Sequence, residues 1–111
     1  MSEKDKGNLM AILDSCSKIK KFSSNIIDAD DLFTDDKTFD AILMNFVVIG
    51  EAVTRLSDKL KNEKDGIPWS KIKGFRNMIA HDYFGVDAEE VWQIIEHDLI
   101  DLELNIKAIL V

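Results

Sequence analysis

The stretch from residue 76 to residue 83 gathers four side chains that can bind phosphate or move protons, namely Arg76, Asn77, His81 and Tyr83. A histidine, whose unperturbed pKa lies near ~6.5, can take a proton from a ribose 2′-hydroxyl or return one to a leaving oxygen. An arginine offers a rigid fork of donors to a phosphate whose charge grows in the transition state. An asparagine can orient the imidazole or a phosphate oxygen, and a tyrosine can donate to a phosphate or stack on a base. The set therefore suits cleavage of a phosphodiester without a metal ion.

Helical geometry limits how these side chains can meet. Asn77 and His81 are four residues apart and lie on one face of a helix. Arg76 and His81 are about 140° apart, because successive residues are about 100° apart around a helix. They can meet only if the arginine stem curls around the helix or if a second copy of the chain faces the first. A plain structural role is the alternative, since such residues near a helix end commonly cap carbonyls or complete an interface.

Metal sites and disulfides are not indicated. His97 lies between Glu96 and Asp98 and has no second histidine or cysteine at ligand spacing. Cys16 is the one cysteine of the chain, which rules out an internal disulfide and a cysteine-rich metal site. We therefore expect no metal and no cofactor, with His97 at the surface and Cys16 as a small buried hydrophobe.

The charge of the chain is strongly segregated along the sequence. Its net charge is −7, and an acidic chain taken as a whole is a poor binder of nucleic acid. Between Arg55 and Arg76, however, seven basic residues stand against three acidic ones, a net charge of +4, so the remainder carries −11. The basic segment runs up to the first residue of the candidate cluster, although Lys71 and Lys73 within it could also belong to an ordinary solvated face.

Apolar residues recur at steps of three and four along almost the whole chain, which predicts helices. The first helix is predicted over about residues 3–25, followed by a short turn around Leu32 and Phe33. The second is predicted to start at Thr34, with Asp35 and Asp36 facing the positive end of its dipole, and its apolar stripe continues to residue 60.

The second half of the chain has the same helical period. Pro68 suits the first turn of a third helix, which is predicted to turn Met78 and its apolar neighbours inward and to end near residues 83–85. Asp87 with Glu90 three residues later predicts a capping box before a last helix. No segment alternates with a period of two. We therefore predict an all-α fold, in which residues 1–111 form a single domain, an up-and-down bundle of four to five helices.

Two features of the second predicted helix point beyond a simple core. This helix is apolar on more than one face, because Met44, Val47 and Val48 widen its core stripe. We therefore expect it to contact another subunit as well. Glu51 lies in the middle of this apolar helix, where a carboxylate is costly unless it is paired. Its natural partners are Arg55 at i+4 and Arg76 across the bundle, and structural pairing is the role we predict for it.

The stretch Arg-Asn-Met-Ile-Ala-His-Asp-Tyr at residues 76–83 resembles the R-N-x-x-x-H-x-Y signature of HEPN domains, specifically the HepT-like toxins of HEPN/MNT toxin–antitoxin modules. The flanking sequence resembles the same family in order along the chain: Ile49-Gly50-Glu51-Ala52, Pro68-Trp69 and Ile72-x-Gly74-Phe75 precede the signature, and Val86-Asp87 and Val91-Trp92-x-Ile94-Ile95 follow it. The similarity covers about residues 39–104. An Arg-x4-His pair alone is weak evidence, whereas the signature with its flanks is specific.

The resemblance implies a homodimer, possibly a higher assembly, in which two signature helices meet at a composite cleft. It implies a metal-independent endoribonuclease in which Arg76 and His81 are catalytic and Asn77 supports them. It also implies that Tyr83 accepts AMP from a partner MNT-type nucleotidyltransferase, the antitoxin, and that this silences the toxin. The basic segment would then face the RNA substrate, with Lys71, Lys73 and Arg55 as its binding residues.

Two other classes of function remain open from the sequence. The chain could be a helical binding subunit that partners a nucleotidyltransferase or holds a nucleotide without turnover, or a purely structural helical oligomer. There is no long apolar run and no basic start followed by an apolar segment, so we expect a cytoplasmic protein without a membrane contact.

Overall fold

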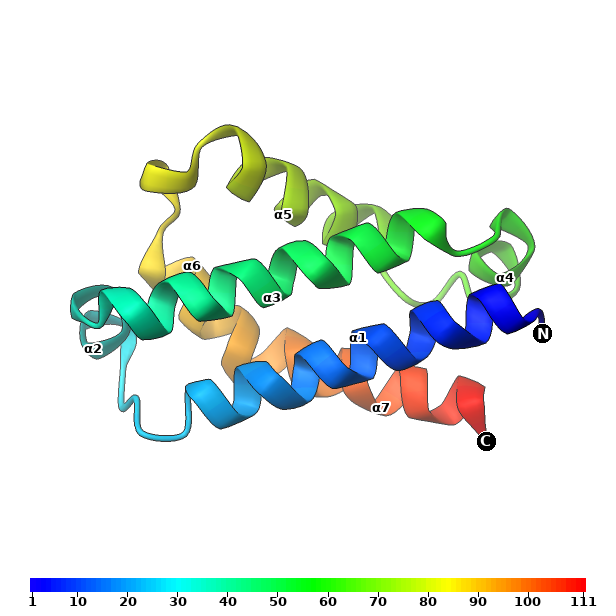
Figure 1. Cartoon of the computed structure of the whole chain (residues 1–111), viewed down its shortest axis with the longest axis horizontal. Helices are drawn as coiled ribbons and strands as arrows, with labels where there is room; N and C mark the ends of the chain where they lie inside the picture. Colours follow the sequence, from blue (N-terminus) through cyan, green and yellow to red (C-terminus); the bar gives the residue numbers. More distant parts are fainter.

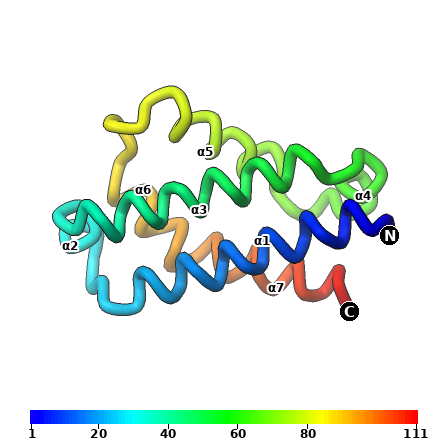
Figure 2. Tube along the Cα trace, viewed as in Figure 1, coloured from blue at the N-terminus to red at the C-terminus, as the bar shows by residue number.

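The computed structural model describes residues 1–111 and contains helices and no strands, which confirms the all-α prediction. Four long helical segments run alternately up and down the molecule (Figures 1 and 2). They are α1 (Glu3–Phe22), α3 (Asp36–Arg55), α5 (Trp69–His81) and a last rod made of α6 (Ala88–Gln93), a π-helical turn η2 (Ile94–Asp98) and α7 (Leu99–Leu110). Three short pieces connect them: α2 (Ala29–Thr34), α4 (Asp58–Glu63) and the 3₁₀ turn η1 (Tyr83–Gly85).

Short polar side chains start most of these helices by accepting a backbone N–H that has no partner in the first turn. The start of α3 is one residue later than predicted: Asp35, not Thr34, is the cap, and its carboxylate accepts from the Thr38 N–H at 3.1 Å. Asp87 caps α6 as predicted. Its carboxylate accepts from the N–H of Glu89 at 3.0 Å, however, and not from that of Glu90, so the predicted capping box with Glu90 is wrong.

The predicted second helix is wrong in its length, because α3 ends at Arg55 and Leu60 belongs to the separate helix α4. Ser57 causes the break, since its hydroxyl accepts from the Leu60 N–H and starts α4. The buried carboxylate of Asp5 in α1 holds this cap in place by accepting from the N–H of Ser57 at 2.8 Å and from its hydroxyl at 2.6 Å. These bonds lower the pKa of Asp5 below its ordinary value.

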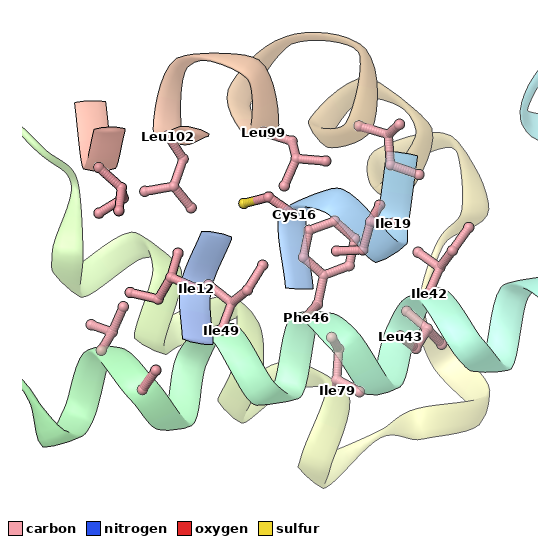
Figure 3. Close-up of a cluster of buried hydrophobic side chains, with 14 of the residues drawn as sticks. Ile12, Cys16, Ile19, Ile42, Leu43, Phe46, Ile49, Ile79, Leu99 and Leu102 are labelled. Carbon is pink, nitrogen blue, oxygen red and sulfur yellow. The ribbon is translucent and has the colours of Figure 1, made fainter. Parts of the chain in front are cut away.

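The core lies where α1, α3 and the last rod face one another, and α5 covers α3 from outside (Figure 1). Figure 3 shows Cys16 among the core side chains, with Ile12 and Ile19 on its own helix α1 and Leu99 on the last rod. Cys16 is buried, which confirms the prediction of a small buried hydrophobe. Burial, and secondarily the charge of Glu103, raises the pKa of its thiol to about 12 and so disfavours the reactive thiolate.

Different segments of the chain lie at the two ends of the bundle. The N-terminus, α4 and the C-terminus lie at one end, and η1 lies toward the other, where α3 begins (Figure 2). The 3₁₀ turn η1 follows α5 directly, so α5 ends at His81, a few residues earlier than predicted. No helix has both the length and the apolar character needed to span a membrane.

Candidate active site

Arg76 lies at a close approach of α5 to α3, and a glycine makes this approach possible. The Cα of Gly50 in α3 faces the base of the Arg76 side chain, and a Cβ at this position would lie 2.6 Å from Arg76 Cγ and closer still to its Cβ. Such a distance is well inside van der Waals contact, so only glycine allows the two helices to lie at this separation. Gly50 therefore sets the position of Arg76.

The guanidinium of Arg76 is held but incompletely satisfied. Its Nη1 lies 3.4 Å from Oε1 of Glu51, which confirms one of the two partners predicted for this glutamate. The Arg76 side chain is 21% exposed, and its Nε is buried without a hydrogen-bond partner. A buried donor left unpaired costs about 1–3 kcal/mol.

His81 and Asn77 occupy the outer side of the same helix. His81 is the last residue of α5 and is exposed, while Asn77 one turn earlier is half-buried. No side-chain hydrogen bond or ion pair is formed by either residue, and none links His81 to Arg76. Within one chain the structure therefore brings Arg76 against Glu51 but does not bring the arginine and the histidine together.

Tyr83 follows on η1 and makes a contact that the sequence did not predict. Its hydroxyl donates a hydrogen bond to Oδ1 of Asp40 in α3, 43 residues away along the chain. This bond, together with desolvation and the charges of Asp40 and Asp36, raises the pKa of Tyr83 to about 12. The turn itself is closed by Asp82, whose Oδ1 accepts from the Gly85 N–H at 3.1 Å.

Two residues of this site were missed as contributors by the sequence analysis. Gly50 left a signal, because a glycine in the middle of an apolar helix often marks a close approach of backbone or side chain. Asp40 left none, since its role depends on a tyrosine that only the tertiary fold brings next to it.

The three predicted RNA-binding residues are all exposed, and none forms an ion pair. They do not lie on one face. Lys73 is about 60° around α5 from Arg76 and shares its side of the helix, whereas Lys71 is about 140° away. Arg55 ends α3 on the side where Glu51 is exposed.

A groove of about 890 Å³ separates α5 from the last rod, and Lys71 lines it together with Phe75, Met78 and Leu102. It exists because α5 packs on α3 and only weakly on the last rod. The prediction that Met78 points into the core is therefore wrong: this side chain is 36% exposed and lines the open groove.

The chain contains no group of three or more His, Cys, Asp or Glu side chains arranged to hold a metal ion. The site thus consists of a guanidinium set against a glycine, an exposed imidazole, a half-buried amide, and a phenol bound to a carboxylate. Such a set can bind and polarise a phosphate and can move a proton.

Comparison with known proteins defines the class to which this bundle and site belong. The model of the family described as "Ribonuclease HepT-like" matches residues 12–109. The chain therefore belongs to the HepT-like ribonuclease family, as the signature resemblance predicted. No solved structure matches it significantly.

Individual relatives agree with this assignment. A protein of Methanocaldococcus jannaschii named "Putative RNase MJ0127" is 32% identical over 98% of this chain and 93% of its own length. "Putative RNase TTE0752" of Caldanaerobacter subterraneus subsp. tengcongensis is 32% identical over 76% of this chain and 75% of its own. "Probable ribonuclease HepT" of Thermococcus cleftensis is 29% identical over 93% of each chain. Family and relatives together support a nuclease.

Proposed function

We propose that this chain is the toxin of a toxin–antitoxin module, a metal-independent endoribonuclease in which His81 moves protons and Arg76 binds the scissile phosphate. The observation that carries the proposal is the incomplete pairing of Arg76, whose buried Nε has no partner while Glu51 engages one edge of the guanidinium. A substrate phosphate that displaces Glu51 offers two oxygens to the arginine fork. His81, exposed and unpaired, can then act on the 2′-hydroxyl or the leaving oxygen, with Asn77 orienting either.

A second copy of the chain completes this site in the proposal. The exposed stripe of α3 has an acidic end at Asp40, an apolar centre at Met44 and Val48, and a basic end at Arg55. Met44 is 61% exposed and Val48 39% exposed, so the centre of the stripe is unpartnered in one chain. If two copies pack with their α3 helices antiparallel, the apolar centres meet and each acidic end faces a basic end. A two-fold axis through one surface patch has this self-complementary form.

The same packing supports a composite cleft. Along α3, Arg76 lies at the level of Gly50, whereas the end of α5 lies at the level of Asp40, because Tyr83 bonds to it. When the two α3 helices pack antiparallel, the Asp40 end of one stripe lies beside the Arg55 end of the other. His81 of the partner subunit is thereby brought toward Arg76. A second copy thus closes the gap of about 140° that separates these two residues around one helix.

Silencing by AMP follows from the position of Tyr83. The phenol is 40% exposed and lies two residues beyond His81, so it is accessible to a nucleotidyltransferase of the MNT type. An attached AMP adds bulk and a negative phosphate beside the imidazole, which blocks RNA and repels its backbone. Lys73 and Arg55, both unpaired, are the positive charges on the side of Arg76 that would hold the RNA, with Lys71 at the edge of the groove.

The test is cleavage of total cellular RNA by the purified chain in the presence of a chelator. The intact mass is measured first, so that AMP on Tyr83 does not mask activity. We expect defined fragments from the unmodified protein and none from His81→Ala, with an unchanged melting temperature because this side chain is exposed. Absence of cleavage by unmodified dimer favours the alternative, a non-catalytic subunit that binds a nucleotidyltransferase or a nucleotide.

A further inference from the structure

The hydroxyl of Tyr83 has a partner within its own chain. It donates to Oδ1 of Asp40, which projects from the second turn of α3 while the tyrosine belongs to η1. Asp40 is exposed and makes no ion pair with a lysine or arginine of its own chain. Tyr83 is also the only tyrosine of the chain. The pair thus consists of one phenol and one carboxylate that has no ion-pair partner within its own chain.

The contact with Asp40 determines the protonation state of the Tyr83 phenol before it reacts. The hydrogen bond to Asp40, followed by desolvation and the negative charges of Asp40 and Asp36, favours the protonated phenol and raises the pKa of Tyr83 to about 12. At neutral pH the hydroxyl therefore keeps its proton. A tyrosine that attacks phosphorus from this position must lose the proton during the reaction, and the atom already bonded to that proton is Oδ1 of Asp40.

We propose that Asp40 is the base for nucleotide transfer to Tyr83, so that this chain supplies both the acceptor hydroxyl and the group that deprotonates it. The inference rests on the proposed function, in which a nucleoside triphosphate is the donor. In the step, Tyr83 Oη forms a bond to the α-phosphorus, the bond from that phosphorus to the oxygen bridging the β-phosphate breaks, and pyrophosphate leaves. The phenolic proton passes to Asp40 Oδ1 and then to water. Protein kinases use an aspartate in the same way toward a substrate hydroxyl.

Tyr83 that carries AMP cannot keep its hydrogen bond to Asp40. Once esterified, Tyr83 Oη has no proton to donate, and the new phosphate diester carries a negative charge next to Asp40 and Asp36. Like charges at this distance repel, so the modified side chain leaves Asp40 and turns outward. The hydrogen bond therefore exists only in the unmodified state.

The first arm of the test measures the phenol directly, because a single tyrosine gives one phenolate signal in an ultraviolet titration. We expect a pKa of about 12 in the wild type and a fall toward about 10 in Asp40→Asn. Asp36→Asn is the matched control, since it removes a neighbouring carboxylate that does not bond to the hydroxyl, and we expect a smaller fall. An unchanged titration in Asp40→Asn would overturn the inference.

The second arm measures the initial rate of AMP transfer from ATP by an MNT-type nucleotidyltransferase, with intact mass as the readout. We expect Asp40→Asn to be about a hundredfold slower, the lower end of the usual general-base effect, and Asp36→Asn to stay within about twofold of wild type. A slower reaction with a more acidic phenol is the signature of a lost base. Equal rates for wild type and Asp40→Asn would overturn the role of Asp40 alone. Failure of the transferase to modify wild-type Tyr83 would instead overturn the silencing mechanism and the inference with it.

Discussion

Gly50→Ala tests whether the close contact between α3 and α5 positions Arg76. The added methyl would lie 2.6 Å from Arg76 Cγ, so the helices must separate by at least about 1 Å to reach ordinary contact near 3.5–4.0 Å. No rotamer relieves the clash, because the methyl also meets Arg76 Cβ, which is fixed to the backbone. Overpacking of this kind costs about 1–3 kcal/mol, and the better helix propensity of alanine returns about 0.5–1 kcal/mol. We expect a net loss of about 1–2 kcal/mol.

The assay combines thermal unfolding with RNA cleavage. For a chain of this size the loss lowers the melting temperature by about 4–8 °C, and a displacement of Arg76 by about 1 Å reduces cleavage about a hundredfold. Gly7→Ala is the matched control, since an added Cβ in α1 meets nothing within 4 Å and should stabilise the protein slightly. The reasoning is refuted if Gly50→Ala melts at or above the wild-type temperature and retains full cleavage.

Three further predictions concern the hydrogen bonds of Asp5 to Ser57, the proposed RNA-binding surface and the proposed dimer. Asp5 has a lowered pKa in the folded state, so its stabilisation is present above the unfolded pKa near ~3.9 and is lost as the pH falls through the folded value. Asp5→Asn should lower the free energy of unfolding by about 1–2 kcal/mol at pH 7 and flatten its decline below pH ~4 in urea titrations; an unaltered acid dependence contradicts this. Lys73→Gln should weaken RNA binding and reduce the salt slope by about 1, whereas Lys71→Gln, on the groove side, should do so less; equal effects in binding titrations would contradict the assigned face. Met44→Glu should convert the proposed dimer to a monomer in light scattering, and an intact dimer would exclude the α3 stripe as the interface.

Much of the fold could be predicted because its causes are local. The helical period, the aspartate that caps α6 and the proline before α5 indicated four long helices in the observed order. The break between α3 and α4 was missed because the apolar stripe continues across it to Leu60, and the signal for the break lies in Ser57 and its tertiary partner Asp5. The exposure of Met78 was missed for a similar reason, since periodicity shows which face is apolar but not whether another helix covers it.

The candidate site also combines features that local sequence predicts with features that depend on tertiary contacts. Residue types and spacing were enough to select Arg76, His81 and Tyr83, and the pairing of Glu51 with Arg76 was one of two partners that helix geometry allowed. The contact of Tyr83 with Asp40 joins elements 43 residues apart, so no local pattern indicates it. The approach that requires Gly50 likewise depends on how two helices pack.

The central claim is that Arg76 of one chain and His81 of another form one RNA-cleaving site. The most direct measurement co-expresses Arg76→Ala with His81→Ala and compares RNA cleavage by the mixed dimers with cleavage by each variant alone. In a heterodimer one site carries both substitutions and the other carries none, so random pairing should restore about one quarter of wild-type cleavage from two inactive variants. Inactive variants that stay inactive when paired would contradict a site shared between chains, and full activity of either variant alone would contradict the roles of these residues.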